Sequence, residues 1–294
     1  MWEKLLYSIQ QGDQRALARA ISLVENAANG FEQLMEKLPA GDVPLIGITG
    51  APGAGKSSLV DALLEEMVKD GKRVIVLCID PSSPFHKGAL LGDRIRMNKW
   101  HSHPNVYIRS LATRGALGGL HPRIIEISEI VRSAPVDYIF IETVGVGQSE
   151  VEIAGLADCT IVVMVPEGGD DIQAMKAGIM EIADLFVVNK ADRPEADHFT
   201  RNVQAMIEFG KKVPVIKTIA TTKSGIQELY LQIMSSLKEH ASSPKKSWLL
   251  TERAYRLISE QRMKDVDRGI LHQKIVSLLR SNQFNLYQLI KEYL

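Results

Sequence analysis

A glycine-rich segment with one lysine and one serine is the part of the sequence best suited to phosphate chemistry. Residues 50–57, GAPGAGKS, match G-x-x-x-x-G-K-[ST] in full, after an apolar β-branched run and before a helical one. The glycines let the backbone curl so that its N–H groups converge on phosphate oxygens, and the following helix adds its positive N-terminal end. Lys56 is expected to contact the β- and γ-phosphates, and Ser57 to place its hydroxyl on Mg²⁺. We therefore expect a nucleoside triphosphate to be bound by Gly50, Ala51, Pro52, Gly53, Ala54, Gly55, Lys56, Ser57 and Ser58.

A second segment indicates which base the nucleotide carries. Asn189-Lys190-Ala191-Asp192 directly follows the apolar run 185–189. An aspartate there can accept both the N1–H and the exocyclic amino group of guanine, a pair of donors that adenine does not present. Asn189 would support the loop, and the Lys190 stem would lie along the base. By itself the pattern also fits a surface turn, but after the phosphate loop it favours guanine.

The residues after a third apolar run are suited to sensing the γ-phosphate. Glu142-Thr-Val-Gly145 is similar to the D-x-x-G element of GTPases, with glutamate in place of aspartate. The carboxylate can reach Mg²⁺ directly or through water, and the Gly145 N–H can contact the γ-phosphate. Val146 follows the glycine where Ras-like proteins have a water-positioning glutamine, and Gln148 comes two residues later. We therefore expect slow intrinsic hydrolysis.

Two further aspartates are candidate site residues. Asp80 ends the apolar run 73–79, and the carboxyl ends of parallel strands are where α/β sheets place ligand-binding groups. It is expected to orient a metal or a water, although a plain turn residue is the alternative. From spacing alone, Asp93 fits a site residue and a helix cap equally well.

The elements that must position these residues follow from seven short apolar runs. The runs do not alternate polar and apolar residues, so both of their faces are expected to be buried, and helix-length segments separate most of them. This pattern predicts an α/β fold, with a parallel sheet and helices on both faces. The expected strands are 43–49, 73–79, 106–109, 136–142, 160–165, 185–189 and 213–219.

The sequence on either side of these runs is helical in pattern. Residues 3–38 are expected to form helices, with Asp13 capping the second. We predict a helical extension over 1–42, a nucleotide-binding domain over 43–240 and a C-terminal helical arm over 241–294. The arm carries apolar stripes and ten basic against five acidic residues, which fits a solvated basic face or a docking or dimerisation arm.

Composition excludes several classes of protein. Lys and Arg total 35 and Asp and Glu total 35, which argues against nucleic acid as the main partner. Hydrophobic residues make up 45% of the chain, as in globular proteins, and no apolar run approaches a membrane span. Cys78 and Cys159 both lie in expected strands, where thiols are usually inert. We expect a cytoplasmic protein that does not associate with membranes.

Together these residues resemble the MeaB/ArgK family of GTPases. The resemblance extends from about residue 3 to 260, and its most specific string is ETVGVGQSE, residues 142–150. The other matching blocks are LARAISLVE at 17–25, GAPGAGKS at 50–57, DPSS at 80–83, LGDR at 91–94, TRGALGG at 113–119 and NKAD at 189–192.

The resemblance implies a function that spacing does not show. It implies a homodimeric P-loop GTPase of the SIMIBI type that uses Mg²⁺, binds GTP and GDP, and has C-terminal helices at its dimer contact. Its partner would be a cobalamin-dependent acyl-CoA mutase, most often methylmalonyl-CoA mutase. The GTPase would act as a chaperone that gates loading of the mutase cofactor and protects it. Which mutase is served, and whether GTP drives loading of the cofactor or removal of a damaged one, stays open.

The resemblance also assigns residues. Asp80, Asp93 and Glu142 match the carboxylates around Mg²⁺ and the attacking water, so with Ser57 they form the expected metal site and with Lys56 the catalytic set. Ala220 lies in the base-binding loop, where Ile-Ala-Thr replaces the usual Ser-Ala. Because that contact is made chiefly by a backbone N–H, guanine binding should survive. A third switch would lie in residues 167–176 and include Gly169, Asp170, Asp171, Gln173 and Lys176.

Two other classes remain as alternatives. His86, His101 and His103 would suit a nickel-delivery GTPase of related fold, but the sequence has no His-rich tail and no paired-Cys motif, which favours surface histidines. An ATPase associated with amino-acid transport, or a protein kinase, is the other class. The NKAD segment argues against adenine, and the catalytic motifs of kinases are missing.

Overall fold

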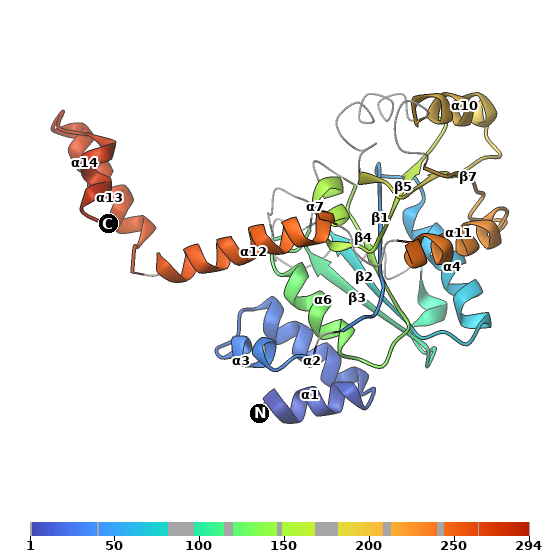
Figure 1. Cartoon of the computed structure of the whole chain (residues 1–294), viewed down its shortest axis with the longest axis horizontal. Helices are drawn as coiled ribbons and strands as arrows, with labels where there is room; N and C mark the ends of the chain where they lie inside the picture. Colours follow the sequence, from blue (N-terminus) through green and yellow to red (C-terminus); the bar gives the residue numbers. More distant parts are fainter. Residues whose placement is uncertain are drawn as a thin grey trace. The chain divides into compact units, whose positions relative to one another are not determined.

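The chain folds into two compact units, residues 1–246 and 247–294. The computed structural model describes residues 2–39, 41–81, 97–114, 120–145, 149–167, 182–207, 213–239, 244–263 and 265–293. The first unit contains a seven-stranded sheet with helices packed on it, and the second contains helices (Figure 1).

The sheet has the order β3-β2-β4-β1-β5-β6-β7, and its neighbouring strands pair in parallel. Each of the seven predicted runs overlaps one strand, so the predicted α/β fold with a parallel sheet is confirmed. The strands are β1 Leu45–Gly50, β2 Val74–Asp80, β3 Val106–Ala112, β4 Tyr138–Glu142, β5 Cys159–Met164, β6 Leu185–Val188 and β7 Val215–Lys217.

Burial of the strands follows their place in the sheet. Every residue of β1, β2, β5 and β6 is buried, which explains why these runs are mostly apolar on both faces. The outermost strands, β3 and β7, include partly exposed residues because each has one neighbour. Cys78 and Cys159 lie in β2 and β5 as buried cysteines outside any disulfide, as predicted. Burial raises the pKa of the Cys159 thiol, which keeps it protonated and unreactive.

Helices cover both faces of the sheet. On one face, α4 (Lys56–Lys69) and α11 (Ile226–Glu239) pack on each other and on the sheet. On the other face, α7 (Ser149–Leu156) packs on β1 and β5. A Cβ at Gly47 of β1 would lie 2.6 Å from Ile153 Cγ1, so α7 approaches β1 closely only because residue 47 is glycine. The remaining elements of the sheet region are η1 Asn98–Trp100, α6 Ile124–Arg132 and α10 Ala196–Ile207.

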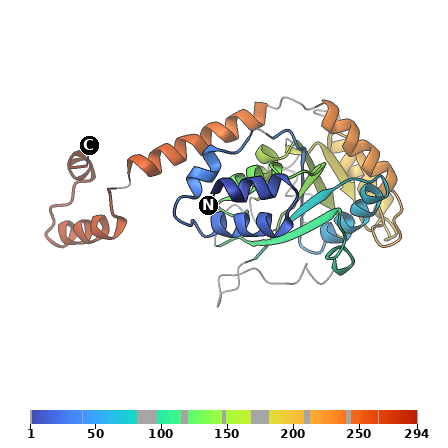
Figure 2. The ribbon, with the colours of Figure 1, turned by 90° about the horizontal axis from the view of Figure 1, so that it is seen from below.

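The N-terminal helices pack on the sheet domain through α6. They are α1 (Trp2–Gln10), α2 (Gln14–Glu25) and α3 (Phe31–Glu36), which confirms helices within residues 3–38. Helix α1 lies beside α2, and α2 packs on α6 (Figures 1 and 2). Asp13 caps α2 as predicted, because its Oδ1 accepts hydrogen bonds from Arg15 N and Ala16 N at 2.8 and 3.2 Å.

The second unit is helical and exposes large apolar side chains. Helix α12 (Pro244–Arg262) begins just before the boundary of the unit, and α13 (Arg268–Arg280) and α14 (Leu286–Lys291) follow. Asp267 and Asn285 cap the latter two. The exposed apolar residues of α12 are Trp248, Leu250, Tyr255, Leu257 and Ile258. Across the described part of the chain, no helix is both long enough and apolar enough to span a bilayer.

Candidate functional site

The phosphate loop connects the buried strand β1 to helix α4. Its three glycines have positive φ, with values of 140° at Gly50, 77° at Gly53 and 88° at Gly55, in a region that other residues rarely adopt. A Cβ at Gly50 would also overlap the carbonyl of Val163 in β5, and one at Gly55 would overlap the side-chain amide of Asn189. Both backbone shape and space therefore require glycine at these positions.

Lys56 is the first residue of α4, and its side chain folds back over the loop. Its Nζ donates hydrogen bonds to the carbonyl oxygens of Gly50 at 2.8 Å and Ala51 at 3.1 Å, although the residue is only 6% exposed. The ammonium group is thus held beside the N-terminus of α4, where the helix dipole favours an anion. This arrangement places two sources of positive charge at the mouth of one loop.

Ser57 and Glu142 form the second feature of the site. Ser57 Oγ donates to Glu142 Oε1 at 2.6 Å, and both residues are buried. Glu142 ends β4, which lies between β1 and β2 in the sheet, and it is in register with Ile48 and Cys78. Asp80, at the end of β2, lies two residues beyond Cys78 and is 3% exposed. Three neighbouring strands therefore end at the site: β1 at the phosphate loop, β4 at Glu142 and β2 at Asp80.

These oxygen donors fit a magnesium ion. Mg²⁺ prefers oxygen ligands and typically takes one or two carboxylates, with phosphate oxygens and waters completing its shell. The Ser57 hydroxyl and the Glu142 carboxylate already lie within hydrogen-bond distance of each other, and Asp80 ends the adjacent strand. The described residues contain no cluster of three His, Cys, Asp or Glu side chains arranged for a metal.

Gly145 lies against the phosphate loop. Its φ is 82°, and a Cβ there would overlap the Gly50 carbonyl and lie 2.6 Å from Lys56 Nζ. The segment that leaves β4 is thus in contact with the lysine expected at the β- and γ-phosphates.

Asn189 joins the phosphate loop to the loop after β7. It is 2% exposed, and its Nδ2 donates to Ala54 O at 2.8 Å. Its Oδ1 accepts from Thr218 Oγ1 at 3.1 Å and from Ala220 N at 3.3 Å. One amide side chain therefore fixes the predicted base-binding loop relative to the phosphate loop.

The rest of the NKAD segment turns outward. Lys190 has a positive φ of 56° and is half-buried, and Ala191 N donates to Thr218 O at 3.0 Å. Asp192 is exposed, with its carboxylate accessible to a ligand. Because β6 and β7 are neighbours, Asp192 and Ala220 lie at the same edge of the sheet as the phosphate loop.

Several predicted residues lie outside the described part of the chain. They are Asp93, Gln148, Gly169, Asp170, Asp171, Gln173, Lys176 and His86. Of the histidines considered for metal delivery, His101 is exposed. His103 accepts a hydrogen bond from Asn105 N through Nδ1 at 3.2 Å and contacts Trp100 edge to face.

Three threonines at the site were missed by sequence reasoning. Thr218 binds Asn189, and Thr143 Oγ1 donates to Thr49 Oγ1 at 2.9 Å behind the phosphate loop. All three are buried. The available signal was a hydroxyl at the end of an otherwise apolar run, since a buried hydroxyl needs a hydrogen-bond partner.

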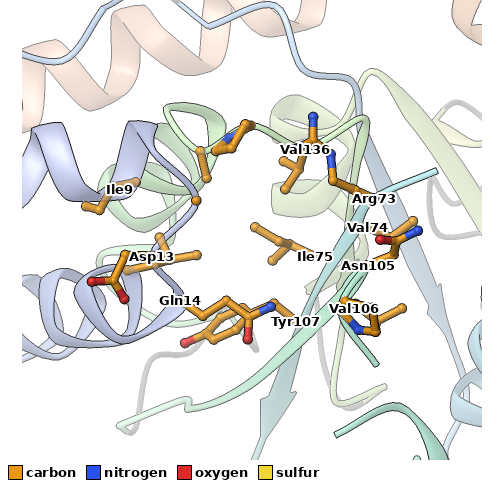
Figure 3. Close-up of a pocket in the computed structure, with 15 residues that line it drawn as sticks. Ile9, Asp13, Gln14, Arg73, Val74, Ile75, Asn105, Val106, Tyr107 and Val136 are labelled. Atoms are coloured by element: carbon orange, nitrogen blue, oxygen red, sulfur yellow. The ribbon is translucent and has the colours of Figure 1, made fainter. Parts of the chain in front are cut away.

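A separate hollow of about 110 Å³ lies at the opposite edge of the sheet (Figure 3). Val74 and Val106, the first residues of β2 and β3, border it together with Ile9 and Gln14 of the N-terminal helices. Since β2 is seven residues long, about 20 Å of strand separates this hollow from Asp80. The hollow is therefore not part of the nucleotide site.

Comparisons with known proteins show similarity along most of the chain. The family model described as methylmalonyl Co-A mutase-associated GTPase MeaB matches residues 17–276. A putative GTPase of Pyrococcus abyssi is 43% identical over 294 residues, which cover 97% of this chain and 89% of that protein. A fused isobutyryl-CoA mutase of Geobacillus kaustophilus is 36% identical over 268 residues, 84% of this chain but 25% of that protein. A solved structure described as an LAO/AO transport system kinase superimposes with a TM-score of 0.70 over 99% of this chain and 95% of that one; at 23% identity this shows the fold alone.

Proposed function

Because the chain belongs to the MeaB family of GTPases, as its resemblance predicted, we propose that it is a GTP-hydrolysing chaperone of a cobalamin-dependent acyl-CoA mutase. The GTPase part of this proposal rests on one observation above the others. Asn189 bonds both the phosphate loop and the predicted base loop, so the proposed phosphate and guanine sites would share one edge of the sheet. A nucleotide bound along this edge has its base over β6 and β7 and its phosphates over β1.

Guanine is selected by Asp192, and the phosphates are bound by the loop and Lys56. The exposed Asp192 carboxylate accepts the two guanine donors. The loop of Ala220, whose N–H donates to Asn189 Oδ1, would lie beside the base. Lys56 then exchanges its bonds to the Gly50 and Ala51 carbonyls for bonds to phosphate oxygens. The backbone N–H groups of residues 50–57 and the N-terminus of α4 complete the anion site.

Ser57, Asp80 and Glu142 would hold Mg²⁺, together with Asp93. When bound, Mg²⁺ neutralises charge on the β- and γ-phosphate oxygens. Asp80, Asp93 and Glu142 also orient the attacking water, and Lys56 stabilises the charge that develops on the transferred group. Hydrolysis is slow because Val146 takes the usual position of the water-positioning glutamine.

Nucleotide state is signalled through segments that contact the γ-phosphate. Gly145 contacts Lys56, so the segment that follows β4 responds to the presence of that phosphate. Residues 167–176, with Gly169, Asp170, Asp171, Gln173 and Lys176, serve as the further switch that reports this state to the partner.

The mutase part of the proposal is supported by the fused relative. That relative is named a fused isobutyryl-CoA mutase, and one segment of it is 36% identical to most of this chain. Where a GTPase is fused to a mutase in one protein, we expect a separate GTPase of the same family to bind a separate mutase. The chaperone would then gate the loading of cobalamin and protect it.

The second unit supports a homodimer. Helix α12 exposes Trp248, Leu250, Tyr255, Leu257 and Ile258, more apolar surface than a solvated helix usually carries. We place the dimer contact on these C-terminal helices and the protein in the cytoplasm.

The test is the steady-state rate of GTP hydrolysis, measured alone and with a purified cobalamin-dependent acyl-CoA mutase. We expect slow, Mg²⁺-dependent turnover that rises when the mutase is added, and tighter binding of GTP than of ATP. Tighter ATP binding would contradict the guanine assignment. A rate that stays constant with methylmalonyl- and isobutyryl-CoA mutases would contradict the mutase partner and favour the metal-delivery class, which nickel binding would then test.

A further inference from the structure

Two buried threonines lie directly behind the phosphate site. Thr49 precedes Gly50 at the end of β1, and Thr143 follows Glu142 at the end of β4. They are 0% and 2% exposed, and Thr143 Oγ1 donates to Thr49 Oγ1 at 2.9 Å. Thr143 N also donates to Ile48 O at 3.0 Å, so the strand pairing extends to this point. The two hydroxyls therefore join β1 and β4 where both strands reach the site.

The threonine pair faces away from the metal-binding side chains. Side chains alternate between the two faces of a strand, and Glu142 points toward Ser57 of α4. Thr143, the next residue, therefore lies on the opposite face. Thr49 lies on that face too, because it is two residues after Gly47, which faces α7. Helix α7 begins at Ser149, shortly after the segment that Thr143 opens.

The segment that Thr143 opens reaches the phosphate loop two residues later. Gly145 lies against Gly50 O and Lys56 Nζ so closely that a Cβ would not fit. Gly50 directly follows Thr49, and Gly145 comes two residues after Thr143. The hydrogen bond between the threonines thus holds the two strand ends from which these contacting residues extend.

We infer that Thr49 and Thr143 are positioning residues that set how well the site distinguishes a nucleoside triphosphate from a diphosphate. This inference rests on the proposed GTPase function. Ser57 and Glu142 supply another side-chain hydrogen bond between the loop and β4, but both are expected to bind Mg²⁺ when the nucleotide is present. The threonine pair lies on the other face and keeps its bond in both states. It therefore holds Gly145 where it would contact a γ-phosphate. A diphosphate lacks this phosphate, so its binding would not depend on the pair.

The chain allows this role to be separated from simple stability. Removing one hydroxyl leaves its buried partner unsatisfied, which destabilises the fold, but replacing both by methyl groups of the same shape is close to neutral. The informative variant is therefore Thr49→Val with Thr143→Val. Thr160→Val is the matched control, because Thr160 is also buried in a strand and its hydroxyl has no hydrogen-bond partner among the described residues.

The experiment measures the dissociation constants of fluorescent GDP and of a fluorescent non-hydrolysable GTP analogue, with Mg²⁺, for the full chain. In the double variant we expect the constant for the analogue to rise about fivefold, the equivalent of one hydrogen bond, and the constant for GDP to stay within about twofold. Thr143→Ser, which keeps the hydroxyl, and Thr160→Val should both match the wild type.

Equal changes in the two constants, or no change in either, would overturn the inference and leave the pair a structural contact. Binding of neither nucleotide by the wild-type chain is a different result. It would overturn the proposed GTPase function itself, and the inference with it.

Discussion

At the scale of single residues, Lys56 places a buried ammonium group beside the phosphate loop. We predict that Lys56→Ala abolishes GTP hydrolysis and weakens GDP binding by tenfold or more, because charged hydrogen bonds to phosphate are lost. The fold should persist, since the hydrogen bonds from Lys56 Nζ to Gly50 O and Ala51 O stay within the phosphate loop and do not join separate elements. Phosphate release and calorimetric titration measure the first effects, and circular dichroism the last.

Lys69→Ala is the control for Lys56→Ala. Lys69 lies at the exposed C-terminal end of the same helix and pairs with Glu66 at 2.7 Å. Its replacement should leave hydrolysis and nucleotide affinity unchanged. A Lys56→Ala variant that still hydrolysed GTP would show that the phosphate loop is wrongly assigned.

Asp192 offers a test of base selection without a stability cost. Its side chain is exposed, so Asp192→Asn should fold normally. An asparagine replaces one acceptor by an N–H donor, which opposes the guanine donors and suits the 2-oxo group of xanthine. We expect the ratio of KM for GTP to KM for XTP to rise by tenfold or more. Asp197→Asn, at another exposed aspartate, should keep the wild-type ratio, and an unchanged ratio in Asp192→Asn would contradict the guanine assignment.

At this scale, residue type predicted the site only where a ligand dictates the type. Lys56, Asn189 and Asp192 are predicted from the sequence because phosphate and guanine would require those groups at that spacing. Thr49 and Thr143 are not, because their bond depends on the register between two strands ninety-four positions apart in the chain. Sequence spacing does not encode that register.

At the scale of elements, the apolar runs predicted each strand of the described residues but not where it ends. The run at 106–109 extends to Ala112 because β3 stays paired with β2 as far as Asp80. The run at 213–219 yields only Val215–Lys217, since Ile219 instead bonds Ser224 across a turn that brings Ala220 to Asn189. Pairing partners decide where a strand ends, and one sequence read alone does not identify them.

Glu25 links the N-terminal helices to a strand that ends at the nucleotide edge. Its carboxylate accepts from Arg109 of β3 at 3.1 Å and from Arg114 at 3.2 Å. Arg114 has a φ of 49°, and the preceding Thr113 N donates to Asp80 O at 3.0 Å. We predict that Glu25→Gln lowers the free energy of unfolding by about 1–3 kcal/mol, because two arginines lose their charged partner in a largely buried place.

Urea unfolding measures that loss, and hydrogen exchange locates it in α2. Glu3→Gln is the matched control, because Glu3 pairs with Lys37 where both side chains are exposed. Exposed ion pairs contribute little, so this variant should unfold like the wild type. Equal stability of the two variants would show that the charge of Glu25 does not help to hold α2.

At the scale of the whole molecule, His121 makes stability depend on pH. The residue is 2% exposed, its Nδ1 accepts from Arg123 N at 3.0 Å, and its Nε2 has no hydrogen-bond partner among the described residues. Burial lowers the pKa of His121 to about 4, although Glu25 and Glu126 oppose this and Arg114 and Arg123 reinforce it. The native state therefore keeps this imidazole neutral, whereas an unfolded chain protonates it below about pH 6.5.

The sign of the effect follows from proton uptake. Between about pH 6.5 and pH 4 the unfolded state binds a proton that the native state does not, so stability falls as the pH falls. From pH 7 to pH 5 this group should cost about 2 kcal/mol, in addition to the contributions of other groups. His121→Asn keeps an acceptor for Arg123 N and removes the titration. The free energy of unfolding, measured with urea at pH 7 and pH 5, should therefore fall by about 2 kcal/mol less in His121→Asn than in the wild type. As a control, His198 is exposed, so His198→Asn should lose as much unfolding free energy between pH 7 and pH 5 as the wild type. If His121→Asn also lost as much as the wild type, His121 would become protonated without unfolding.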